Sequence, residues 1–189
     1  DGGIIGEIFA GGYCADLVGT QVMEDGRIRA VEMVLTGGTI GREGLRIFGG
    51  ADHATVTGDI YVRMEGSANV TSILVGGSNA GKVDGNIVLD LISGTANKVE
   101  AAGKGWDTGF DLAHIEGDVW VNLYSGFNLG HGLTGGIYGG KETSNYVSID
   151  KEDCYSRLHF AEGKEYKLAS IVENGYDTSA DSVIVTGFD

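Results

Sequence analysis

Proline is absent from the 189 residues of this chain, and Cys14 and Cys154 are its only cysteines. The lack of proline favours strands in the interior of a sheet, because proline cannot donate a backbone hydrogen bond to a neighbouring strand. The two thiols could pair, but without motif spacing they support neither a disulfide framework nor a zinc site. No apolar run approaches the roughly 18 residues that a membrane-spanning helix needs, so we expect no membrane insertion.

Basic residues are also scarce, since 13 lysines and arginines face 27 acidic residues and the formal net charge is −14. This balance disfavours nucleic acid and anionic membrane surfaces as partners, because contacts with phosphates need clustered basic side chains. The chain starts Asp1-Gly2-Gly3, without an initiator methionine or a charged-then-apolar leader segment. We therefore expect it to be a piece of a longer protein.

Glycine, in contrast, is abundant, with 34 residues that separate short apolar runs. Three segments share one pattern, an apolar residue, any residue, Gly, and Asp or Asn before an alternating strand. They are "VTGDIYVRMEGS" from Val56, "VDGNIVLDLISGT" from Val83 and "IEGDVWVNLYSG" from Ile115, which begin 27 and 32 residues apart. Such self-similarity predicts a protein built from repeats.

A second element recurs between these segments, a short strand that is closed by glycines. It is found as "EIFAGG" (7–12), "LRIFGG" (45–50), "SILVGG" (72–77), "GGIYGG" (135–140) and, more weakly, "VEAAGKG" (99–105). The first unit has "RAVEMVLTGG" (29–38) where the later units have their long strand, which gives about four coils. Glycine suits the corners of such coils, where the backbone needs a positive φ or a close approach.

Alternation within the long strands predicts one buried face. Its aligned triplets are Val31, Met33 and Leu35; Ile60, Val62 and Met64; Ile87, Leu89 and Leu91; and Val119, Val121 and Leu123. We therefore predict an all-β fold, a right-handed parallel β-helix of about four coils over residues 1–145. An antiparallel β-sandwich is the main rival, but it gives no reason for a pattern that returns after 27 residues.

The segment 146–189 is more charged and poorer in glycine, and we expect it to cap the open end of the same domain. Strand-like runs occupy 146–149, 167–172 and 182–186, and "VENGYD" contains an Asn-Gly signal for a hairpin.

The stretch "ILVGGSNAGKVDG" (73–85) has the glycine and lysine spacing of a phosphate-binding loop. Such a loop needs Ser or Thr after the lysine and a helix that begins there, whereas Val83 follows Lys82 and opens a strand. Gly76-Gly77 also matches the turns at Gly49-Gly50 and Gly139-Gly140. We therefore predict that no nucleotide binds here and that Lys82 is a solvent-facing turn residue. We also predict no other cofactor and no metal ion.

Asp59, Asn86 and Asp118 each stand directly before a long strand. They form either a cation or polar-ladder site or, as we favour, a set of turn residues whose side chains bond backbone N–H groups.

The outward positions of the long strands carry the candidate ligand-binding residues. In three columns these positions are Glu32, Tyr61, Val88 and Trp120; Val34, Arg63, Asp90 and Asn122; and Thr36, Glu65, Ile92 and Tyr124. From them we select Tyr61, Arg63, Asp90, Trp120 and Tyr124, because aromatic rings beside charged groups can stack on sugars or meet a protein. The alternative is packing beneath a loop, for which the insertion 103–114 is a candidate.

Asp90 and Glu65 with Arg63 are the alternative acid–base set, for glycoside cleavage or lyase chemistry. The four histidines, His53, His114, His131 and His159, show no ligand spacing and fit surface positions better than catalytic ones. We select no catalytic residue.

With these repeats, the chain resembles the glycine-rich parallel β-helix regions of bacterial cell-surface adhesin-like proteins of the autotransporter-passenger type. The "IFGG", "ILVGG" and "IYGG" closures and the "GDI", "GNI" and "GDV" strand starts carry the resemblance, over roughly residues 4–149. It implies a secreted or surface-displayed protein, usually without catalysis, whose solenoid is a spacer or a binding face.

Three functions remain open at this stage, since fold alone does not choose among them. The first is a non-enzymatic fragment that acts in adhesion or display, with a host or cell-surface glycan or protein as partner. The second is a polysaccharide-active β-helix enzyme, a lyase or a glycosidase. The third is a structural spacer with no ligand.

Overall fold

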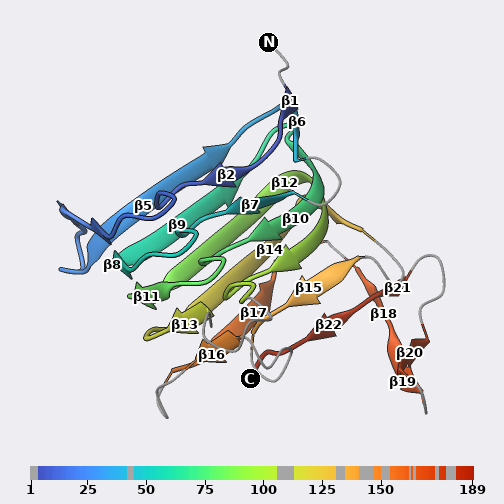
Figure 1. Cartoon of the computed structure of the whole chain (residues 1–189). Coiled ribbons are helices and arrows are strands. Elements are labelled where there is room, and N and C mark those ends of the chain that lie inside the picture. The colour runs from blue at the N-terminus through green and yellow to red at the C-terminus, as the bar shows by residue number, and fades with distance from the viewer. Residues whose placement is uncertain are drawn as a thin grey trace.

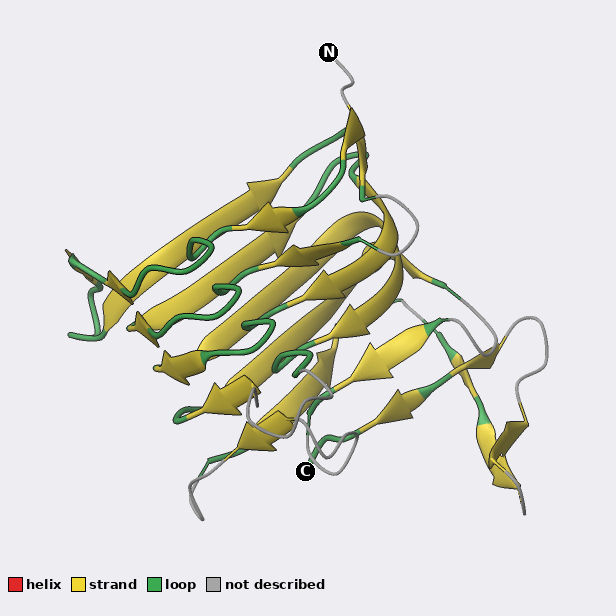
Figure 2. Ribbon diagram, in the orientation of Figure 1, coloured by secondary structure: helices red, strands yellow, loops and turns green. Residues whose placement is uncertain are grey.

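The computed structural model describes residues 4–41, 45–105, 113–130, 135–140, 147–149, 154–161, 163, 165–172, 175–177 and 182–189. Every regular element within these residues is a β-strand, so the predicted all-β class is confirmed (Figure 2). The largest sheet has 13 strands and curls into a half-barrel (Figure 1).

The long strands of successive repeats lie side by side in this sheet and pair in parallel. They are β5 (Ile28–Leu35), β9 (Asp59–Met64), β12 (Ile87–Glu100), β14 (Val119–Leu129) and β17 (Ser156–Phe160). Val31 is opposite Ile60, Ile60 is opposite Ile87, and Ile87 is opposite Val119. The predicted alignment of the four triplets is thus confirmed, and their side chains are buried in one hydrophobic core.

The glycine-closed short strands form a second parallel series on the curled part of the sheet. This series contains β2 (Ile8–Phe9), β7 (Arg46–Phe48), β10 (Asn69–Val75), the end of β12, β15 (Gly136–Tyr138) and β22 (Val185–Thr186). Ile47, Leu74, Val99 and Ile137 are aligned and fully buried. At the beginning of the series, β1 (Ile4–Ile5) pairs with β6 (Thr39–Ile40), and β6 pairs with β10.

The Gly-Gly corners after these strands stack so closely that a side chain does not fit. A Cβ atom on Gly49 would overlap the carbonyl oxygen of Gly76, and one on Gly77 would overlap that of Ala102. Close approach of the backbone is therefore the reason for glycine at these corners. Positive φ is required at other glycines, among them Gly58 with φ 118°.

A separate five-stranded parallel sheet is formed by short strands that come before the long strands in the chain. The sequence pattern did not predict this sheet. Its strands are β3 (Leu17–Val18), β8 (Val56–Thr57), β11 (Lys82–Asp84), β13 (Ala113–Ile115) and β16 (Val147–Ile149). The pattern treated Val56, Val83 and Ile115 as the lead into the long strands and not as members of a sheet of their own. The chain instead turns at the glycine that follows, as at Gly58, and only then enters the next strand.

The C-terminal segment adds strands to both the 13-stranded and the five-stranded sheet. The strands β16, β17 and β22 extend the parallel sheets, whereas β18 (Lys167–Leu168) pairs only with β21 (Ser182–Val183) among the described strands. The predicted hairpin is confirmed, because β19 (Ser170–Val172) pairs antiparallel with β20 (Gly175–Asp177). Residues 146, 173 and 174 lie outside the described part.

Antiparallel pairing is the exception in the described part of the chain. Besides the hairpin, only β4 (Gln21–Val22) is antiparallel, and it pairs with the start of β5. This pairing pattern contradicts the antiparallel β-sandwich. Cys14 is exposed, Cys154 is buried, and the two thiols are not bonded to each other.

Candidate functional site

The outward face of the long strands brings together four of the five predicted site residues. Tyr61 is opposite Val88, which in turn is opposite Trp120, and Arg63 is opposite Asp90 in the next column. These side chains are half-buried, because their strands alternate between the core and the outer surface.

Asp90 is the centre of a hydrogen-bonded group on this face. The Tyr61 hydroxyl donates to Asp90 Oδ2 at 2.6 Å, and Asn122 Nδ2 donates to Asp90 Oδ1 at 2.7 Å. Burial raises the pKa of Tyr61 to about 12, and the hydrogen bond and negative charge of Asp90 act in the same direction. The phenol therefore stays protonated and serves as a fixed donor near neutral pH.

Arginine side chains lie against both aromatic rings. The Arg29 guanidinium is 5.1 Å from the centroid of the Tyr61 ring, and that of Arg157 is 4.8 Å from the centroid of Trp120. Arg63 Nη2 instead pairs with Glu65 Oε2 at 2.6 Å. The two carboxylates of the predicted acid–base set thus have different partners, Arg63 for Glu65 and the Tyr61–Asn122 pair for Asp90.

Tyr124 does not join this group. Leu91 is opposite Leu123, but Ser93 is opposite Gly126, so β14 has one extra residue at this point. Tyr124 lies at this bulge and is exposed. The predicted third column is therefore interrupted there.

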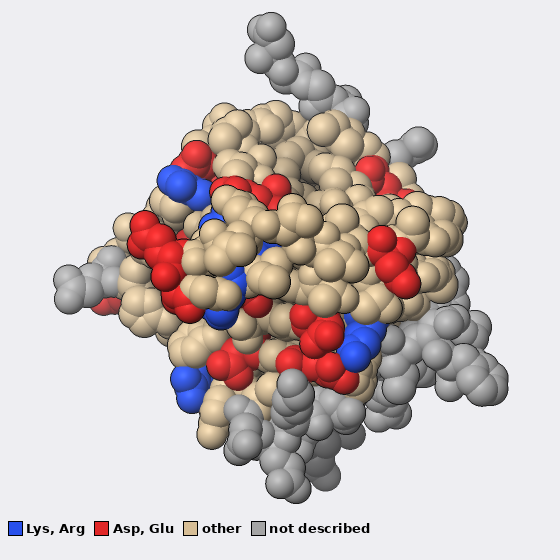
Figure 3. All heavy atoms as spheres, turned by 90° about the vertical axis from the view of Figure 1, so that its left-hand side faces the viewer, with Lys and Arg blue, Asp and Glu red and all other residues tan. Residues whose placement is uncertain are grey.

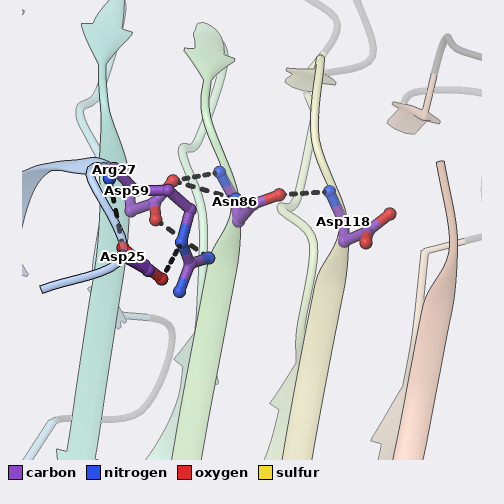
Figure 4. Close-up of polar contacts among 5 residues, drawn as sticks. All are labelled: Asp25, Arg27, Asp59, Asn86 and Asp118. Carbon is purple, nitrogen blue, oxygen red and sulfur yellow. Dashed lines mark hydrogen bonds and ion pairs between the residues drawn. The ribbon is translucent and has the colours of Figure 1, made fainter. Parts of the chain in front are cut away.

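Asp59, Asn86 and Asp118 form a ladder that links neighbouring repeats at the corner before the long strands (Figure 4). Asp59 Oδ1 accepts from the backbone N–H of Asn86, and Asn86 Oδ1 accepts from that of Asp118, both at 2.8 Å. Asp118 Oδ1 accepts in turn from the backbone N–H of Tyr155 at 2.8 Å. These side chains bond backbone N–H groups, as the favoured prediction expected, but the bonds link neighbouring repeats and do not close local turns, so the arrangement is the polar ladder that was the alternative.

Arg27 reaches this corner from the turn between β4 and β5, where Gly26 has φ 84°. Its guanidinium pairs with Asp25 Oδ2 at 2.7 Å and with Asp59 Oδ2 at 3.1 Å (Figure 4). The hydrogen bond to Asp25 raises the pKa of Arg27, whereas the Arg27 backbone N–H and guanidinium lower the pKa of Asp25. Acidic side chains cover more of this side of the molecule than basic ones (Figure 3).

A groove of about 480 Å³ lies where the ladder meets the outward face. The residues that line it are Arg27, Asn86, Val88, Asp118, Trp120 and Asn122. Its volume is within the range of small-molecule sites, about 300–1,000 Å³. Only Trp120 of these six was a predicted ligand-binding residue. The sequence signal that could have located the groove is the ladder, because each ladder residue stands two residues before a member of the Trp120 column.

The stretch that resembled a phosphate-binding loop has a different structure. β10 ends at Val75, the corner 76–81 follows, and Lys82 begins the short strand β11. Lys82 Nζ pairs with Glu116 Oε2 at 2.9 Å, and this pair raises the pKa of Lys82. Lys82 is thus a strand residue rather than a turn residue, and no helix begins within residues 73–85.

The histidines of the described part do not converge on one site. His53 Nδ1 is 2.7 Å from Asp52 Oδ2, His114 Nε2 is 3.7 Å from Glu116 Oε1, and His159 is exposed on β17. His131 lies outside the described residues, as does 106–112, most of the insertion that was a candidate cover. Within the described ranges, no three His, Cys, Asp or Glu side chains are grouped as metal ligands.

Fold and site together define an all-β repeat protein with an aromatic and polar groove on the outer face of its long strands. No protein-family model, curated protein or solved structure matches this chain. The described residues include no helix that is long and apolar enough to cross a membrane.

Proposed function

We propose that the chain is a non-enzymatic segment of a secreted or surface-displayed bacterial adhesin-like protein. In this proposal, residues 1–145 are the coils of a right-handed parallel β-helix and residues 146–189 are its cap. The parallel register of the long strands and the stacked Gly-Gly corners support this architecture.

The groove beside Trp120 carries the functional part of the proposal. A repeat that serves only as a spacer needs no aromatic ring next to a hollow on its outer face, and Trp and Tyr are enriched at binding interfaces. Here Trp120 lies between Arg157 on one side and the groove on the other. The outward face therefore contacts a cell-surface ligand, and the buried face maintains its shape.

A cell-binding assay tests this role. The 189-residue chain, fluorescently labelled, is added to host cells and to bacterial cells as wild type, Trp120→Ala and Tyr13→Ala. Tyr13 is the matched control, because it is an exposed aromatic residue that does not line the groove. We expect Trp120→Ala to abolish most of the bound signal and Tyr13→Ala to retain it. Equal binding by all three proteins would exclude the groove, and no binding by any would favour the spacer.

A further inference from the structure

We propose that the groove binds one ring of a neutral saccharide, stacked on Trp120 and hydrogen-bonded to the amide and carboxylate groups around it. This inference rests on the proposed function and names the ligand class of the same site. Three features of the groove lead to it, namely its apolar floor and wall, its polar rim and its charge balance.

The floor and one wall of the groove are apolar. Val88 lies in the same column as Tyr61 and Trp120, so the two aromatic positions are two strand spacings apart, roughly 10 Å. The smaller valine and Trp120 both line the groove, whereas Tyr61 does not. Arg157, whose guanidinium lies over the indole, belongs to the strand on the other side of Trp120 from Val88, and the indole lines the groove together with Val88. A sugar ring presents C–H groups to such a surface.

The rim combines donors and acceptors within a short distance. Asn122 uses one N–H for Asp90, and Asn86 uses Nδ2 for Asp59 and Oδ1 for the Asp118 backbone. A side-chain amide has two N–H groups and two lone pairs on oxygen, so each asparagine retains a further donor and acceptor. Asp118 Oδ1 accepts from the backbone N–H of Tyr155, and Oδ2 accepts from no residue in the described part of the chain. Vicinal hydroxyls, which both donate and accept, match this set.

The charge of the groove favours a neutral sugar over an acidic one. Arg27 is its only cation among the lining residues, and two carboxylates, those of Asp25 and Asp59, already neutralise it. Asp118 adds a negative charge, and no described cation pairs with it. Even with Arg157 over the Trp120 ring, the two cations Arg27 and Arg157 stand against the three carboxylates of Asp25, Asp59 and Asp118. A uronic acid or sulfated sugar would therefore meet net repulsion, which the overall charge of −14 increases.

Calorimetric titration of the 189-residue chain tests the inference. The probes are neutral oligosaccharides of glucose, galactose and mannose, and oligomers of the corresponding uronic acids at equal length. We expect at least one neutral probe to bind, with the acidic counterpart weaker by about tenfold or more. Val88→Phe, which places a larger side chain in the groove, and Trp120→Ala should each weaken binding by about tenfold or more, whereas Tyr13→Ala should not change it. Thermal unfolding of each variant verifies that it is folded.

The outcomes separate the inference from the proposed function. Equal or tighter binding of the acidic probes, or unchanged binding by folded Val88→Phe, overturns the inference. If Tyr124→Ala, rather than Val88→Phe, abolishes saccharide binding, the ligand lies on the outward face but outside the groove, and only the inference fails. If no saccharide binds while wild type still adheres to cells through Trp120, the ligand class is wrong and the binding role stands. If neither binding occurs, both fail.

Discussion

The inward and outward side chains of the same long strands differ in how they vary between repeats. Inward, the aligned residues Ile60, Ile87 and Val119 are all aliphatic and fully buried. Outward and one residue later, Tyr61, Val88 and Trp120 differ in size and polarity in every repeat. Packing against the next repeat restricts the inward set, whereas the outward set is free to carry a ligand site. The following predictions test this contrast.

Substitution at the Gly-Gly corners should lower the free energy of unfolding the most. A Cβ atom on Gly77 meets the carbonyl oxygen of Ala102 and, at 2.9 Å, Cδ1 of Ile87, so Gly77→Ala must separate two stacked repeats. We expect a loss of about 3 kcal/mol or more in the free energy of unfolding, measured by urea denaturation. Gly37→Ala is the control, because its nearest atom would be Ser67 Oγ at 3.4 Å. A stable Gly77→Ala protein would contradict the close stacking.

Neighbouring residues of β12 should respond according to the face they occupy. Leu89 is fully buried, and Leu89→Ala should cost about 2–5 kcal/mol in the free energy of unfolding. Val88 is half-buried on the outer face, and Val88→Ala should cost about 1 kcal/mol or less. Denaturant unfolding of the two variants measures this contrast. Similar losses for both would mean that the strand does not alternate between core and surface.

The ladder of Asp59, Asn86 and Asp118 should contribute less than the core to the free energy of unfolding. Asn86→Ala removes the acceptor for the Asp118 backbone N–H and the second donor to Asp59. We expect a loss of about 1–2 kcal/mol, because a half-buried N–H loses its partner. Asn69→Ala on β10 is the control, since Asn69 is exposed and should tolerate the change. If Asn69→Ala were as costly as Asn86→Ala in thermal unfolding, the ladder would have no special role.

The smallest expected effect is on the alkaline pH dependence. The pKa of Tyr61 is about 12 in the folded chain, compared with about 10 for an exposed tyrosine. Between these values the unfolded chain has lost the proton that the folded chain keeps, so stability falls as pH rises from about 10 to about 12. Tyr61→Phe should show a smaller fall in urea unfolding over this interval. Part of the fall should persist, because burial also raises the pKa of Tyr166 to about 12. An identical pH dependence in the variant would contradict the raised pKa of Tyr61.

The inward face and its register could be predicted from the sequence because one physical demand recurs in every repeat. Each triplet such as Ile87, Leu89 and Leu91 must fill the same space between the same neighbours, so its pattern returns with the repeat. The Gly-Gly corners are equally regular, since two stacked backbones leave no room for a Cβ atom.

The groove could be predicted only in part, because it combines repeated and unique features. Trp120 and the ladder residues follow from the pattern, but Arg27 comes from a hairpin turn that, within the described ranges, only the first repeat has before its long strand. Tyr124 was misplaced by a single extra residue in β14, which no pattern of alternation reveals. The parallel pairing of β17 with β14 and of β22 with β15 could not be predicted either, because the C-terminal segment lacks the glycine pattern of the repeats.

The stacking of long strands is most directly measured as a distance between two spin labels. Val34 and His159 are exposed, and the register Val34–Arg63–Asp90–Asn122–His159 places four strand spacings between them. With Cys14→Ser and Cys154→Ala removing the native thiols, labels at Val34→Cys and His159→Cys should give one narrow distribution near 20 Å, from roughly 4.8 Å per strand. A distribution centred beyond about 30 Å, or without a defined maximum, would contradict the in-register parallel stack on which the groove depends.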